Sequence, residues 1–100
     1  MFDIEQTETY RRWFAKLRDR TARAKIDLRI KRLAHGNPGD VRFVGEGVLE
    51  LKIDHGPGYR VYYIRRAVQV ILLLAGGDKR TQTSDIHAAI DLAARFRSAK

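Results

Sequence analysis

Hydrophobic positions recur with a helical period in the N-terminal part of this 100-residue chain. Residues spaced three or four apart lie on one side of a helix. Thr7 can cap a first helix, and Asp19 or Thr21 can begin a second. The two predicted stripes consist of Tyr10, Trp13, Phe14 and Leu17, and of Ala22, Ile26, Ile30 and Leu33. The pattern predicts a helical hairpin, and the glycines and proline of residues 36–40 end its second helix.

Alternation of apolar and polar residues predicts the strands. Residues 2–6 form a short first strand. From Val41 the period is two, and the apolar residues 49, 51 and 53 alternate with Glu50, Lys52 and Asp54. A turn at residues 55–58 leads into a strand over residues 59–65, and residues 65–67 form a short connection. The nearly continuous apolar run of residues 68–75 predicts a central strand covered on both faces. We expect the last three strands to form an antiparallel meander.

The C-terminal part predicts a break followed by a helix. Residues 76–80 break the last strand, and Ser84 or Asp85 can cap a helix with an apolar stripe made of Ile86, Ala89, Ile90, Ala93 and Phe96. The predicted order is therefore β-α-α-β-β-β-α. This is an α+β fold, a single domain over residues 1–100, with an antiparallel sheet packed against an N-terminal helical hairpin and a C-terminal helix.

The charge of the chain changes this picture. It contains 20 Lys and Arg but only 12 Asp and Glu, which gives a formal net charge of +8. Such an excess favours an anionic partner, either RNA, DNA, an acidic protein or a membrane surface, although a basic face can also serve solubility alone. Cysteine is absent, which excludes disulfides and thiol chemistry. The acidic N-terminus resembles no signal peptide, and no apolar run could span a bilayer. A cytoplasmic protein with no membrane association is expected.

The sequence lacks the motifs of several kinds of catalytic and binding site. The sequence has no nucleotide P-loop, no dinucleotide-binding glycine pattern and no metal-ligand spacing among its acidic residues and histidines. We therefore expect neither a cofactor nor a metal. The serines have no nucleophile context, and the aromatic stripe of the first helix is expected to be core.

With these sites excluded, the remaining polar residues predict a cationic cleft. In a meander, the 55–58 turn and the 76–82 loop lie on the same side of the sheet. This would gather Arg60 with Lys52, Asp54, Asp78, Lys79, Arg80 and Gln82. Such a cleft suits metal-free RNA cleavage, because arginine can hold the charge of the transition state while another group moves protons. Each residue also has a structural interpretation: Arg60, Lys79 and Arg80 as solvated charges, and His55 and His87 as ordinary surface residues.

Two segments carry a family resemblance. Residues 50–63, ELKIDHGPGYRVYY, and residues 72–82, LLLAGGDKRTQ, resemble motifs of the RelE/ParE toxin superfamily. More narrowly, they are similar to the phage-derived Gp49-like, HigB-type group of addiction module killer proteins. The aromatic first helix and basic second helix are similar as well, so the resemblance covers essentially the whole chain.

The resemblance implies a toxin of a bacterial type II toxin–antitoxin module. RelE-like toxins cleave mRNA in the ribosomal A site without metal, whereas ParE-like toxins poison DNA gyrase. The implied partner is an antitoxin, often with a helix-turn-helix domain, through which the toxin reaches operator DNA. Arg60 matches the arginine that contacts the scissile phosphate, and Lys79 and Arg80 match the basic loop after the last strand. His87 falls near a C-terminal Tyr or His position, and Lys52 lies in a strand that carries basic residues.

These expectations combine into one leading interpretation, an mRNA endoribonuclease. Arg60 and Lys79 would stabilise the phosphorane, Lys52, Arg80 and Gln82 would bind RNA, and His87 or His55 would transfer protons. The second helix would bind ribosomal RNA through its basic residues Arg23, Arg29 and Lys31. Two other interpretations stay open, a non-enzymatic gyrase inhibitor and an inactive relic that still binds its antitoxin.

Overall fold

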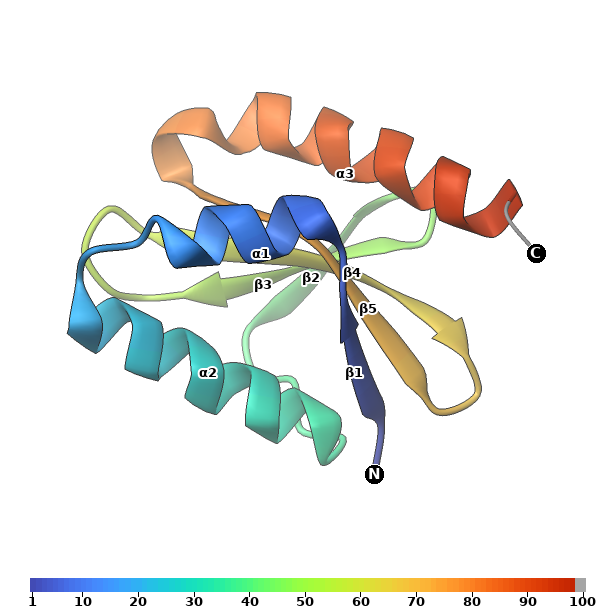
Figure 1. The fold of residues 1–100 in the computed structure, drawn as a ribbon, viewed down its shortest axis with the longest axis horizontal. Coiled ribbons are helices and arrows are strands. Elements are labelled where there is room, and N and C mark those ends of the chain that lie inside the picture. Colours follow the sequence, from blue (N-terminus) through green and yellow to red (C-terminus); the bar gives the residue numbers. More distant parts are fainter. Residues whose placement is uncertain (99–100) are drawn as a thin grey trace.

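A sheet with the strand order β1-β5-β4-β3-β2 forms the centre of the molecule in the computed structural model, which describes residues 1–98 (Figure 1). β1 runs parallel to β5, and all other neighbours are antiparallel. The strands are β1 (Asp3–Gln6), β2 (Val41–Gly45), β3 (Val48–Ile53), β4 (Tyr59–Ala67) and β5 (Val70–Asp78). The helices are α1 (Glu8–Ala15), α2 (Arg20–Ala34) and α3 (Gln82–Ser98), and a 3-10 turn η1 (Lys79–Thr81) precedes α3.

Both faces of the sheet are covered, which divides the core into two clusters. On one face, α1 and α2 contribute Tyr10, Ile26 and Leu33, which pack on β-residues such as Leu51 and Leu73. On the other face, α3 contributes Ala89 and Ala93, which pack on Val48, Tyr62 and Leu74. The alternation of each central strand therefore serves two cores. The predicted α+β class is confirmed. No helix within residues 1–98 is long and apolar enough to cross a membrane.

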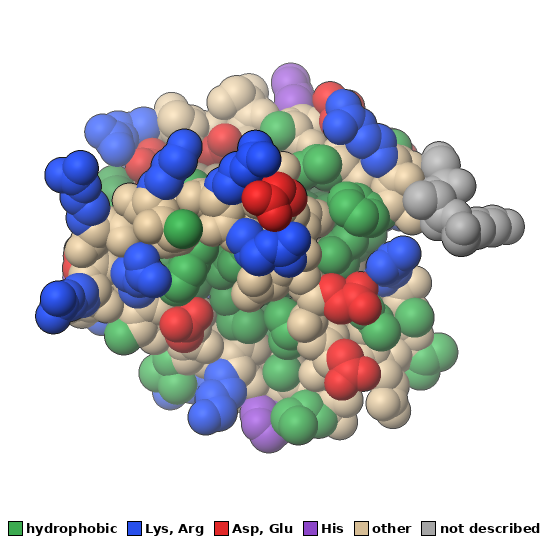
Figure 2. Space-filling model, in the orientation of Figure 1, with side chains coloured by type: hydrophobic (Ala, Val, Ile, Leu, Met, Phe, Trp, Pro, Cys, Tyr) green, Lys and Arg blue, Asp and Glu red, His purple; other side chains and the backbone are tan. Residues whose placement is uncertain are grey.

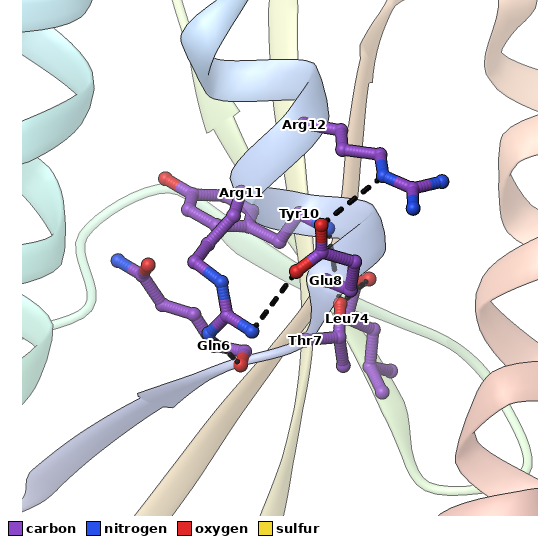
Figure 3. A network of polar contacts seen from close by, with 7 residues as sticks. All are labelled: Gln6, Thr7, Glu8, Tyr10, Arg11, Arg12 and Leu74. Carbon is purple, nitrogen blue, oxygen red and sulfur yellow. Dashed lines mark hydrogen bonds and ion pairs between the residues drawn. The ribbon is translucent and has the colours of Figure 1, made fainter.

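Thr7 connects the first strand, the first helix and the centre of the sheet (Figure 3). Its hydroxyl oxygen accepts a hydrogen bond from the Tyr10 amide at 3.0 Å and donates one to the Leu74 carbonyl at 2.6 Å. The side chain is therefore both the predicted helix cap and a link to β5. Glu8, in the first turn, pairs with Arg11 and Arg12 on the exposed side of α1.

The predicted strand order lacked one strand, β2. Residues 41–53 form two strands, because Gly45, Glu46 and Gly47 all have positive φ and turn the chain back on itself. Glycine takes such angles readily, so the pair around Glu46 makes a tight hairpin possible. β2 thereby becomes an edge strand, and Arg42 lies directly opposite Glu50.

Three predicted boundaries were wrong. β4 continues to Ala67 through the expected connection, so β5 begins at Val70. β5 does not stop at the glycines, because Gly76 and Gly77 still pair with Val61 and Arg60 of β4. The last helix begins at Gln82, before the predicted caps, because η1 already starts the helical path. Asp78 caps η1 by accepting a 2.8 Å hydrogen bond from the Arg80 amide.

Candidate functional site

A polar pocket of about 380 Å³ opens on the α3 face of the sheet, next to the first turn of α3. Two cross-strand pairs form its floor, Arg42 with Glu50 and Lys52 with Arg60. Its lining consists of Asp40, Arg42, Glu50, Lys52, Arg60 and Gln82. Three cations therefore surround a single buried carboxylate. This arrangement partly fulfils the predicted cleft, because Lys52, Arg60 and Gln82 do come together.

Glu50 is the buried centre of this pocket, with 2% of its surface exposed. Its two carboxylate oxygens accept hydrogen bonds from Arg42 Nε and Gln82 Nε2, both at 2.9 Å. Burial alone would raise the pKa of Glu50, but the hydrogen bonds from Arg42 and Gln82 and the charge of Arg42 outweigh it and hold the pKa below its usual value. Glu50 is therefore a carboxylate at neutral pH.

Arg60 is buried to a degree that is unusual for an arginine, with 6% of its surface exposed. One terminal nitrogen donates a 2.6 Å hydrogen bond to the Gly58 carbonyl. Its Nε lies 3.9 Å from Glu50 Oε2 and has no hydrogen-bond partner among the described residues. Buried donors are normally satisfied, and a guanidinium suits phosphate oxygens. Its Nε is enclosed beside Glu50, and Arg60 thus adds a fixed cation to the lining of the pocket.

The glycine pair at the end of β5 lets two side chains lie directly on the sheet. A Cβ on Gly76 would lie 2.1 Å from the Trp13 ring, and a Cβ on Gly77 would lie 1.8 Å from Asp85 Oδ2. Trp13 comes from α1 and Asp85 from α3, so the two glycines receive one helix on each face. Because Gly77 pairs with Arg60, the Asp85 carboxylate comes next to the pocket.

Comparison with known proteins gives the family. The model of the family described as phage derived protein Gp49-like (DUF891) matches residues 12–97. The chain belongs to the Gp49-like family. This family is associated with the RelE/ParE-like toxin superfamily, so the predicted resemblance is confirmed at that level. A relative from Haemophilus influenzae, described as an uncharacterized protein, is 49% identical over 86 residues, which are 86% of this chain and 87% of the relative. No solved structure matches the chain significantly.

The predicted basic loop of this Gp49-like chain lies beside the pocket. Tyr59 pairs with Asp78, so the 55–58 turn and the start of η1 are neighbours, as expected. The Lys79 amide donates to the Pro57 carbonyl at 3.4 Å, and the Lys79 side chain starts next to Gly58. Lys79 and Arg80 are exposed, and Arg80 Nη2 lies 3.0 Å from Asp78 Oδ2. Neither lines the pocket itself.

The two candidate histidines of the Gp49-like chain lie elsewhere. His55 Nε2 is 3.0 Å from Oδ2 of Asp19, the residue that caps α2. His87 is exposed on α3 and does not line the pocket. Their roles in proton transfer remain predictions. Within residues 1–98, no group of three His, Asp or Glu side chains could hold a metal ion.

The predicted RNA-binding residues of α2 have different surroundings. Arg23 donates to the Leu17 carbonyl at 3.1 Å and stacks on Phe14, so it holds the end of α1. Arg29 donates to the carbonyls of Pro38 at 2.9 Å, of Asp40 at 3.2 Å and of Lys52. Lys31 is exposed. Of the three, Lys31 has the clearest access to a ligand, and RNA binding by all three remains a prediction.

Sequence reasoning missed Arg42 and Glu50 in the Gp49-like pocket. The alternation of residues 49–53 indicated a half-buried strand, which would place Glu50 in solvent. The signal that could have corrected this is the continuous apolar run of β5, which already indicated a sheet covered on both faces. On such a sheet, a glutamate that faces a helix is buried and needs partners.

Proposed function

We propose that this chain is a single toxin domain of a bacterial type II toxin–antitoxin module, of the HigB type, and that it cleaves ribosome-associated mRNA in the cytoplasm without a metal. The observation that carries the proposal is the pocket around Arg60, to which Arg42 and Lys52 add two further cations. An RNA phosphodiester supplies the oxygens that a guanidinium binds. Membership of the Gp49-like family supports the toxin role.

The role proposed for each basic residue follows from its position relative to the pocket. Arg60 and Lys52 lie opposite each other on β3 and β4, and they would hold the non-bridging oxygens of the phosphate. Lys79, at the neighbouring turn, would reach in from the rim to the developing charge of the phosphorane. Arg80 and Gln82, which follow it along the chain, would bind the flanking RNA backbone.

The proposed partners divide between nucleic acid and protein. The exposed basic side chains of α2, Lys31 among them, would bind ribosomal RNA by charge. A cognate antitoxin, with a helix-turn-helix domain of its own, would neutralise the toxin. Operator DNA would then be bound only by way of the antitoxin.

Controlled expression of the chain in bacteria, followed by primer extension on abundant mRNAs, tests this function. The native chain is expected to arrest growth and to produce discrete new 5′ ends. Arg60→Ala should reduce cleavage by ~10²–10³-fold, as for the loss of one donor to a developing charge.

The matched control is Arg66→Ala, which removes an exposed arginine from the opposite end of the same strand, where it pairs with Glu5. It should cleave like the native chain. Growth arrest with intact mRNA and loss of supercoiling would indicate a gyrase inhibitor instead. Normal growth, with a folded and antitoxin-binding chain, would indicate an inactive relic.

A further inference from the structure

We propose that Glu50 is the proton acceptor of this pocket, and that its carboxylate takes the proton of the RNA 2′-hydroxyl as the 2′-oxygen attacks the adjacent phosphorus. This inference rests on the proposed ribonuclease function and adds to it the residue that moves the first proton. None of the sequence motifs assigned a role to Glu50, and its position among the cations of the pocket is what indicates one.

The geometry places the carboxylate where an attacking hydroxyl would be. Arg60, the proposed phosphate ligand, has its Nε 3.9 Å from Glu50 Oε2. A phosphate bound to Arg60 therefore lies beside Glu50, within reach of a 2′-hydroxyl on the neighbouring ribose. Arg42 and Gln82 each donate to one of the carboxylate oxygens, and the Tyr62 hydroxyl lies beside the carboxylate as well.

The surroundings fix the protonation state that a base needs. The charged and titratable groups around Glu50 are Arg42 from β2, Arg60 and Tyr62 from β4, Lys52 on its own strand, and Asp40 at the rim. α3 presents the neutral Gln82 and also Asp85, whose charge acts on the neighbouring Tyr62. Burial works against ionisation, but the hydrogen bonds from Arg42 and Gln82 prevail and lower the pKa of Glu50. The carboxylate is thus unprotonated throughout the neutral range.

The proposed step balances without any further reagent. The O2′–H bond breaks and its proton goes to Glu50, while O2′ forms a bond to phosphorus and the P–O5′ bond breaks. The products are a 2′,3′-cyclic phosphate and a 5′-hydroxyl, whose oxygen takes a proton from water. Glu50 then returns its proton to solvent. Arg60 and Lys52 hold the extra negative charge of the phosphorane in between.

Other groups fit this role less well. His55 lies 3.0 Å from Asp19, at the end of α2 and outside the pocket lining. His87 is exposed on α3. Asp40 lines the pocket, but it is exposed at the rim, and the structure gives no contact that aims its carboxylate at Arg60. Glu50 is the carboxylate that is held in one orientation by two donors.

Single-turnover cleavage of an mRNA held in the A site of purified ribosomes, by the native chain and by Glu50→Gln, tests the inference. The glutamine keeps the shape and can still accept a hydrogen bond from Arg42, but it cannot take the proton. Cleavage should fall by ~10²–10⁴-fold, the usual contribution of a general base. Binding of a 2′-O-methyl oligonucleotide, which cannot react, should stay equal or become tighter because a negative charge leaves a cationic pocket. Glu5→Gln, which removes a carboxylate from β1 at the far edge of the sheet, is the matched control and should cleave normally.

The pH profile separates a base from a residue that only positions Arg42. Because the pKa of Glu50 is lowered, the native rate should fall only at a pH lower than the ordinary glutamate value of 4.5, as Glu50 takes up a proton. In Glu50→Gln this acid limb should disappear. A limb of unchanged shape at a uniformly lower rate, or normal cleavage by the variant, would overturn the proposal. A native chain that leaves RNA intact would instead reject the ribonuclease function, and this inference with it.

Discussion

At the scale of single residues, the consecutive glycines of β5 show how one position can be required for packing and its neighbour for the site. Both keep backbone pairs with β4, so their role is the absence of a side chain. Gly76 leaves room for the rigid ring of Trp13, and Gly77 leaves room for the end of the Asp85 side chain. The two contacts differ in how easily the neighbour can move.

Replacement of each glycine by alanine should therefore give unequal losses of stability. Gly76→Ala forces the Trp13 ring away from the sheet and should lower the free energy of unfolding by ~1–3 kcal/mol, as overpacking usually does. Gly77→Ala meets a carboxylate that can turn about its own side-chain bonds, so its loss should be smaller. Urea unfolding of the two variants checks this order, and a larger loss for Gly77→Ala would contradict it.

At the scale of elements, α2 is held against the rest of the molecule at two points. Asp19 caps its first turn by accepting a 3.1 Å hydrogen bond from the Ala22 amide, and it also contacts His55 in the turn after β3. Ten residues further, Arg29 donates to carbonyls at the start of β2 and in β3. One of the three predicted RNA ligands on this helix, Arg29, and the candidate histidine His55 thus take part in tying α2 to the sheet.

The cap of α2 makes a prediction with a definite pH dependence. The amide of Ala22, and then the hydrogen bond from His55, lower the pKa of Asp19. A lowered pKa means that the stabilisation is present above the unfolded value of about 3.8 and is lost as the pH falls through the folded value. Asp19→Ala should reduce the melting temperature at pH 7, and the difference should shrink at pH 3. Asp19→Asn, which keeps the cap, should lose less.

Element types were largely predictable from the sequence, and the errors have local causes. The cap Thr7 was correct, Asp19 was one of the two predicted starts of α2, and the helical stripes were correct except that α1 ends at Ala15, before Leu17. A 3.6-residue period over two or more turns is a strong signal. The β2–β3 hairpin was missed because Glu46 takes a positive φ, which a glutamate in the sequence does not indicate. The glycines after Ala75 suggested a break, but sheet pairing with β4 outweighed their weak strand preference.

At the scale of the whole molecule, positive charge is spread outside the pocket as well as within it. On the face seen in Figure 2, Lys and Arg side chains gather over α1 and the end of the molecule where α1 leads into α2.

The positions of the pocket residues depend on the packing of α3, so only Lys52, Arg60 and Gln82 could be anticipated from motifs. Glu50 and Arg42 could not, because their burial and pairing require the complete sheet.

Salt dependence tests the role of this wider surface. If Lys31 contacts a phosphate of ribosomal RNA, Lys31→Ala should reduce the slope of log affinity against log salt by ~0.7–0.9, the value for one released counterion. Arg95→Ala, which removes an exposed cation from the helix on the other face, should leave the slope unchanged. Equal slopes for Lys31→Ala and the native chain, measured with purified ribosomes between low and physiological salt, would place the contact elsewhere.

The parallel pairing of β1 with β5 also bears on the order in which the protein is made. Thr7 at the end of β1 binds a carbonyl 67 positions later in the chain, and the pocket needs residues from Asp40 to Gln82. During translation, β1 emerges long before its partner β5 and remains unpaired until β5 has been made. Contacts of such long sequence separation form late in folding. A nascent chain therefore lacks its pocket until the residues up to Gln82 have left the ribosome that makes it.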